Sequence, residues 1–237
     1  MIAVILMVGA LFPAVGSSIG ELDLPKGVSE LLGGADYGTL RGWMRSEIGA
    51  VYGPLVVGAA AATGASTLLA GEEASGILAI VLAHPLSRAS LVFSKAAAVG
   101  IIAGVISLAT MVGLTLGVAI GGGGVAVADL GALSLHLALF GCLLGSASLA
   151  AAAASGRTGP AVGFASALGI LGYLINGLAP LIDGLAWLRY LSPFYYYAGG
   201  DPIANGTDLS HLAVLAVGTV SLTIFAAVAM ARRDLRA

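Results

Sequence analysis

The chain alternates long apolar stretches with shorter polar junctions. Six stretches have the length of a membrane-spanning helix, which needs ~20 apolar residues to cross the hydrocarbon core. Because backbone groups must be satisfied internally in a bilayer, we expect helices there. The pattern predicts an all-α polytopic membrane protein, with residues 1–237 forming one six-helix transmembrane domain. The predicted spans are residues 1–17, 49–71, 92–120, 130–154, 159–182 and 209–231.

The composition supports this reading. Hydrophobic residues make up 59% of the chain and charged residues 9%, with a mean hydropathy of +1.03. Soluble domains carry about 25% charged residues. The net charge of −2 and the absence of a long basic run argue against a nucleic-acid-binding surface. The expected surroundings are therefore a lipid bilayer.

The first apolar stretch is the weakest of the six. It is short, it lacks a basic flank, and Pro13 lies within it. A cleaved signal peptide would account for it, but no clear Ala-x-Ala cleavage site follows. The pattern favours an uncleaved span.

Basic residues predict the orientation, because short cytoplasmic loops are enriched in Lys and Arg. The loops on one side hold four basic residues, but these loops are about twice as long and carry nine acidic residues. We therefore expect the other side, with both termini, to be cytoplasmic. The basic residues on that side are Arg88, Lys95, Arg157, Arg232, Arg233 and Arg236.

Ionisable side chains are nearly absent from the predicted spans. His136 is the only one well inside a span, and no metal ligand accompanies it at helical spacing, so we interpret it as a packing or pore-lining residue. A self-sufficient secondary transporter, or an intramembrane enzyme acting on lipid, would need ionisable or catalytic groups near the midplane. Both remain alternatives. The pattern favours a protein driven from outside the membrane, with no catalytic residue or metal site.

The most elaborate polar junction is GEEASGILAIVLAHPLSRASLVFSK, residues 71–95. Glu72 and Glu73 end the second span, where carboxylates would suit the start of a following helix. Apolar residues within 73–83 predict a short helix lying in the interface. Pro85 disfavours helix at the preceding residue and should end it.

The second half of this junction leads into the third span. Ser87 is a candidate N-cap, and Arg88 and Lys95 are placed to anchor the new helix among the headgroups. A transverse helix held between two spans could tilt both of them together. A simple polar turn with snorkelling basic residues would give the same pattern, so both readings stay open.

The junction closely resembles that of ABC-2-type transporter permeases, the membrane subunits of bacterial ABC exporters. Two further segments resemble the same family: LSPFYYYAGGDPIANG at 191–206, and the loop from Leu24-Pro25 to Pro54. Ile77 stands where that family usually has threonine, and the chain begins inside the first span, without the family's basic elbow helix. The matching junction positions are Ala70, Gly71, Glu72, Glu73, Gly76, Leu78, Pro85, Ser87, Arg88 and Lys95.

The resemblance implies a role in transport. Residues 72–91 would dock onto a separate ABC ATPase subunit, which would bind ATP and Mg²⁺, so the chain itself would need no cofactor and would not be an enzyme. Two permeases, identical or sister chains, would pair in the bacterial inner (plasma) membrane and export a hydrophobic or amphipathic drug, natural product or lipid. The implied ATPase-coupling residues are Glu72, Glu73, Gly76, Leu78, His84, Pro85 and Arg88.

Aromatic residues gather between the fifth and sixth predicted spans. Six of them lie within 187–197. Their amphipathic rings are typical of a belt at headgroup depth. The resemblance adds short re-entrant helices that would cover the outer end of the pathway. The expected outer gate consists of Pro193, Phe194, Tyr195, Tyr196 and Tyr197.

Overall fold

The structure is a computed structural model that describes residues 2–20, 25, 28, 31, 38–122 and 124–233. Helices are the only regular secondary structure within these residues, which confirms the all-α expectation. Five helices are long and apolar enough to cross a membrane, and they match the last five predicted spans. They are Leu40–Ala74, Arg88–Ile120, Val127–Ser155, Thr158–Leu181 and Leu209–Arg232.

The first predicted span forms helix α1 (Ile2–Gly20). Its apolar part is shorter than the five spanning candidates, so the count of six stays a prediction. Helix α1 packs against α7 (Arg88–Ile120), and glycines allow the two backbones to meet. A Cβ added to Gly9 would lie only 2.8 Å from the Cα of Gly117.

The second span is one continuous composite helix that begins nine residues before the predicted start. Thr39 caps it by accepting a 3.1 Å hydrogen bond from the Gly42 amide. Pro54 has no N–H, and the chain accommodates it after a π-helical stretch in which the Gly53 amide donates to Ile48 five residues back. Its segments are α3 (Leu40–Met44), η1 (Arg45–Tyr52), α4 (Gly53–Ser66), η2 (Thr67–Gly71) and α5 (Glu72–Ala74).

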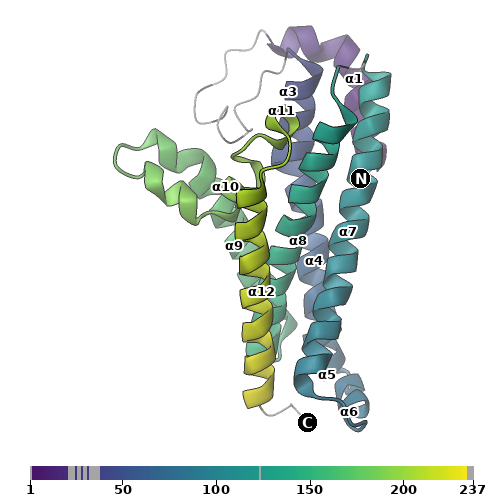
Figure 1. Ribbon diagram of the computed structural model, residues 1–237, viewed down its shortest axis with the longest axis vertical. Helices are drawn as coiled ribbons and strands as arrows, with labels where there is room; N and C mark the ends of the chain where they lie inside the picture. Colours follow the sequence, from purple (N-terminus) through teal and green to yellow (C-terminus); the bar gives the residue numbers. More distant parts are fainter. Residues whose placement is uncertain are drawn as a thin grey trace.

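Helix α8 (Val127–Ser155) lies at the centre of the bundle (Figure 1). It packs against α4, α7, α9 (Thr158–Leu178) and α12 (Leu209–Arg232). Small residues permit this closeness, since a Cβ on Gly141 would lie 2.7 Å from Val57 Cγ2.

Two different sets of short elements close the ends of the bundle (Figure 1). One end carries α5, α6 (Ile77–Leu82) and the last turn of α12. The other, which we call the distal end, carries α3, α10 (Pro193–Ala198) and α11 (Pro202–Asn205). Between α9 and α10, the 3₁₀ turns η3 (Ala179–Leu181) and η4 (Ala186–Leu191) project to one side.

Candidate functional site

The junction between the second and third spans, residues 72–91, is a short helix held between two long ones. The composite helix runs on through α5, and the chain then turns at Gly76, whose φ of 76° lies in the left-handed region that glycine tolerates. The predicted helix over 73–83 is shorter than expected, because only Ile77–Leu82 follow that turn. Ser87 caps α7 as predicted, accepting a 3.0 Å bond from the Ser90 amide.

Glu73 forms a buried ion pair with Arg233 beyond the end of α12. The two guanidinium nitrogens lie 2.8 and 2.5 Å from the two carboxylate oxygens. The Glu73 side chain is only 2% exposed. Hydrogen bonding to Glu73 raises the pKa of the Arg233 guanidinium above its usual value, so the cation persists throughout the working pH range.

Arg233 and Arg88 extend this ion pair into a cluster of four chain segments. Arg233 Nε donates a 2.9 Å bond to the carbonyl of Ala153 near the end of α8. Arg88 donates to two carbonyls at the end of α12, those of Met230 at 3.1 Å and of Arg233. These carbonyls lack partners within the helix, so the guanidinium of Arg88 acts as a C-cap for α12.

Glu72 is tied to the other side of the junction. Lys95 on α7 approaches its two carboxylate oxygens at 2.7 and 2.6 Å. Both side chains are largely shielded, with exposures of 16% for Lys95 and 22% for Glu72. The pair therefore joins the end of the composite helix to the second turn of α7.

These contacts correct part of the sequence interpretation. Glu72 and Glu73 do not open a new helix, because the composite helix passes through them. Lys95 forms an ion pair with Glu72, and Arg88 donates to carbonyls at the end of α12, so both side chains have partners within the protein. Their role as anchors among the headgroups stays a prediction. The sequence does not show these pairings, because residues far apart in the chain supply the partners.

The surface of α6 divides into a buried side and an exposed side. Leu78 is 1% exposed and belongs to the apolar cluster that also contains Val92 and Met230. Ile77, Ile80 and Leu86 are instead 48%, 69% and 51% exposed. The other predicted junction residues, Gly76, His84 and Pro85, lie on the same exposed part of the chain.

The five predicted gate residues lie on or next to α10 at the distal end, and the structure separates them into two groups. Phe194 and Tyr197 are buried and pack with Phe140 of α8, at ring-centroid distances of 4.7 and 5.1 Å. Pro193 is buried beside them, and Tyr195 and Tyr196 are partly exposed. The belt interpretation is therefore wrong for Phe194 and Tyr197, which belong to the core of the bundle.

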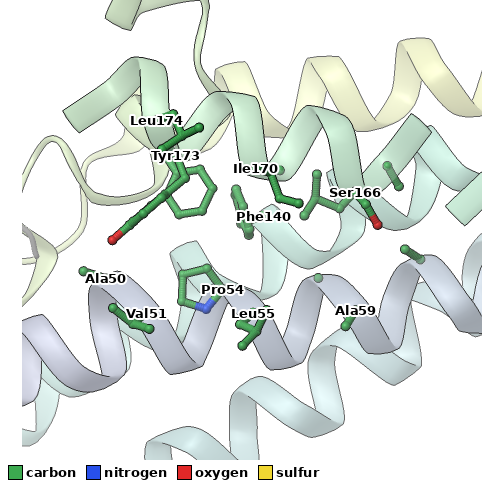
Figure 2. A pocket seen from close by; sticks show the side chains of 16 residues that line it. Ala50, Val51, Pro54, Leu55, Ala59, Phe140, Ser166, Ile170, Tyr173 and Leu174 are labelled. Atoms are coloured by element: carbon green, nitrogen blue, oxygen red, sulfur yellow. The ribbon is translucent and has the colours of Figure 1, made fainter. Parts of the chain in front are cut away.

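A cavity of about 290 Å³ lies between α4, α8 and α9, and the sequence did not reveal it. Figure 2 shows Pro54, Leu55 and Ala59 facing Ile170 and Tyr173 across it. The lining is almost wholly apolar, and Ser166 supplies one of its few polar groups. No group of His, Cys, Asp or Glu that could hold a metal occurs among the described residues.

The comparisons with known proteins agree with this architecture. The family model described as "ABC-2 family transporter protein" matches residues 1–235. A search of curated proteins finds no match. With nearly its whole length covered by the family model and five apolar spanning helices, the chain belongs to the ABC-2 family of transporter proteins.

Proposed function

We propose that this chain is the membrane-spanning permease subunit of an ATP-driven ABC exporter. A separate ATPase subunit would bind ATP and Mg²⁺ and supply the energy. A second permease copy, or a sister permease, would complete the pathway for a hydrophobic or amphipathic cargo such as a drug, a natural product or a lipid. The chain would span the bacterial inner membrane, with residues 72–91 and both termini on the cytoplasmic side.

The observation that carries this proposal is that α6 has one buried side and one exposed side. Leu78 fixes the helix to the bundle, while Ile77 and Ile80 remain exposed at one end of the molecule. A partner that covers these side chains would remove apolar surface from water, at roughly 25 cal/mol per Å². This arrangement favours docking of a protein subunit onto α6.

The ion pairs of the junction provide a route from α6 into the bundle. Glu72 binds Lys95 on α7, and Glu73 binds Arg233 after α12. A displacement of α6 would therefore act on α7 and α12 together. Packed interfaces of this kind switch between discrete arrangements and do not deform continuously.

The test is coexpression of the tagged chain with the P-loop ATPase encoded nearest to its gene. We expect the two proteins to copurify, the pair to hydrolyse ATP, and the chain alone to hydrolyse none. Ile80→Asp and Leu86→Asp should each reduce the recovered ATPase at least tenfold, because a carboxylate would be buried at the contact.

A matched control is Val127→Asp at the distal end, where the side chain is 53% exposed. An acidic residue is tolerated in the first turn of a helix, so copurification should be unchanged. If Ile80→Asp and Leu86→Asp both retain the ATPase at the level of Val127→Asp, docking onto α6 is wrong.

A further inference from the structure

The apolar cavity opens sideways from the bundle, between α4 and α9. Leu55 on α4 and Ile170 on α9 line it and are 63% and 62% exposed. Figure 2 shows these two side chains on facing helices. Phe140 and Leu144 of α8 also line the cavity, but both are buried. The cavity is therefore a cleft with α8 as its floor and a mouth between α4 and α9.

On the side of the junction, direct contacts between the helices close the cleft. Ala62 of α4, Ala147 of α8 and Ala165 of α9 form a small buried cluster there. The hydroxyl of Ser148 donates a 2.7 Å bond to the carbonyl of Ala62, which ties α8 to α4. The three helices are thus joined at this point and cannot slide together to fill the space beside it.

On the distal side, aromatic rings bound the cleft. Phe194 of α10 packs edge-on against Phe140 and Tyr173, at centroid distances of 4.7 and 5.3 Å. Ser192 at the start of α10 donates a 2.6 Å bond to the carbonyl of Gly172, which ties α10 to α9. Because both ends are fixed, an empty cleft would leave its lining without contacts on one side, and a ligand would restore those dispersion contacts.

The cleft lies near the middle of the two spans that border it. The composite helix has no charged residue between Glu47 and Glu72, a stretch of roughly 36 Å at about 1.5 Å per residue, and Ala59 near its middle lines the cleft. Helix α9 and the turn after it have none between Arg157 and Asp183. Since the hydrocarbon core is ~30 Å thick, the mouth faces hydrocarbon, and a molecule reaches it through the bilayer.

The size of the cleft favours a thin occupant. Its volume is about 290 Å³. A dry apolar cavity of about 150 Å³ binds one benzene molecule, and 290 Å³ accommodates roughly ten groups the size of a water molecule. One turn of a helix, about 10 Å across and 5.4 Å long, fills roughly 400 Å³. A helix of a second copy is therefore too wide to occupy the cleft.

The residues at the mouth also disfavour a second copy. Helices associate in membranes through small residues at the contact. Here the small residues Gly58 and Gly169 are buried or partly buried in the lining, whereas the bulky side chains of Leu55 and Ile170 stand at the mouth.

We propose that this cleft binds the unbranched hydrocarbon chain of a lipid that enters sideways from the bilayer. Shape and dispersion contacts select the chain, because the surrounding lipid is as apolar as the lining. The proposal deepens the proposed transport function, since the chain would then belong to the cargo. It rests on that function in this respect alone.

The experiment is photolabelling of the full chain in nanodiscs of phosphatidylcholine, without nucleotide or ATPase. The probe is a phosphatidylcholine that carries a diazirine midway along one acyl chain, and mass spectrometry maps the adducts. We expect adducts on Phe140 and Leu144, which are 0% and 4% exposed and are reached only through the cleft. Leu108 of α7, which is 62% exposed, reports ordinary contact with lipid.

Variants that fill the cleft assign the adducts to it. Ala59→Phe and Ser166→Phe place a ring at the lining of α4 and of α9. Each should lower labelling of Phe140 and Leu144 at least fivefold. Ala167→Phe is the matched control, since Ala167 is exposed on α9 next to Ser166 and does not line the cleft. Labelling of α7 should be the same in all three variants, which shows that they are folded in the discs.

A rigid ligand tests the selection by shape. A photoactivatable cholesterol should label the exposed face of α7 but not the floor of the cleft on α8, because its fused rings are too bulky for the volume. Equal labelling of α8 by the sterol would overturn the proposal. So would the absence of adducts on Phe140 and Leu144, or unchanged labelling in both Ala59→Phe and Ser166→Phe.

A second copy over the mouth is the remaining occupant to test. Leu55→Cys, in a chain that also carries Cys142→Ala, should stay monomeric when the discs are treated with an oxidising catalyst. A disulfide-linked dimer would place another copy over the mouth and overturn the proposal. None of these measurements involves the ATPase. Failure here and failure of docking onto α6 are therefore distinguishable.

Discussion

Arg233 and Glu73 form a two-point ion pair across 160 positions of sequence, with nitrogen–oxygen distances of 2.8 and 2.5 Å. The pair joins the start of the junction to the end of the last helix. Arg88 contacts the carbonyl of the same Arg233, and Ala153 accepts a bond from its Nε. Arg233 thus links several chain segments at one end of the bundle, through its guanidinium and its carbonyl.

Removing this guanidinium should destabilise the protein strongly. Arg233→Gln leaves the carboxylate of Glu73 buried without its cation, which costs about 3 kcal/mol. Thermal unfolding in detergent measures the loss, with Arg232→Gln as the control at the neighbouring exposed position. Adding Glu73→Gln to Arg233→Gln should recover part of the stability. An equal melting temperature for the Arg232 and Arg233 variants would contradict the structure.

The hydroxyl of Tyr197 should contribute to the distal core. It donates a 2.7 Å bond to the carbonyl of Gly49 in the π-helical stretch η1, and the ring is fully buried. Burial raises the pKa of this phenol, so it stays protonated. Tyr197→Phe should lower the free energy of unfolding by about 1–2 kcal/mol, since the Gly49 carbonyl loses its donor. Tyr196→Phe, at a more exposed ring, should change it less.

Gly100 and Gly141 each begin a Gly-x-x-x-Gly pair, with Gly104 and Gly145, but they should respond differently to substitution by alanine. A Cβ on Gly141 would lie 2.7 Å from Val57 and 3.0 Å from Ala103, whereas a Cβ on Gly100 would have no atom within 4 Å. Gly141→Ala should therefore force helices apart and lower the melting temperature. Gly100→Ala should leave it unchanged or raise it, because alanine favours helix by about 1 kcal/mol. Similar destabilisation by both would disprove this packing.

Asp208 should stabilise the start of α12 in a pH-dependent way. Its carboxylate accepts bonds from the Ser210 amide at 2.9 Å, the Ser210 hydroxyl at 2.6 Å and the His211 amide at 3.1 Å. The bond from the Ser210 side chain, followed by that from the His211 backbone, lowers the pKa of Asp208. The stabilisation is thus present above the carboxyl's ordinary pKa and is lost as pH falls through its lowered one.

The cap can be tested by comparing two substitutions. Asp208→Ala should cost about 1 kcal/mol at neutral pH, and Asp208→Asn should cost little, because asparagine caps helices equally well. The difference between wild type and Asp208→Ala should shrink in acid, as followed by melting temperature against pH. A difference that does not change with pH would refute the carboxylate's role.

The apolar pattern alone determined the five long helices and their ends to within a few residues, except at the start of the composite helix. Ser87 was recognisable as an N-cap and Pro85 as the end of a helix, because both effects act on residues within a few positions in the sequence. The apolar pattern did not predict the part of the composite helix that precedes residue 49. Arg41, Arg45 and Glu47 lie there, and their polarity hid a helix that the bundle stabilises.

Only the tertiary structure decided which polar and small residues meet. The sequence placed Glu73 in a junction but could not name Arg233 as its partner, because α12 must first pack against α8 and α7. Gly100 and Gly141 each stand four positions before another glycine, yet of the two only Gly141 lies where helices touch. The cavity beside Phe140 likewise exists only once α4, α8 and α9 are assembled. The spacing of residues along one helix indicates which of them share a face, but not which neighbouring helix packs against that face.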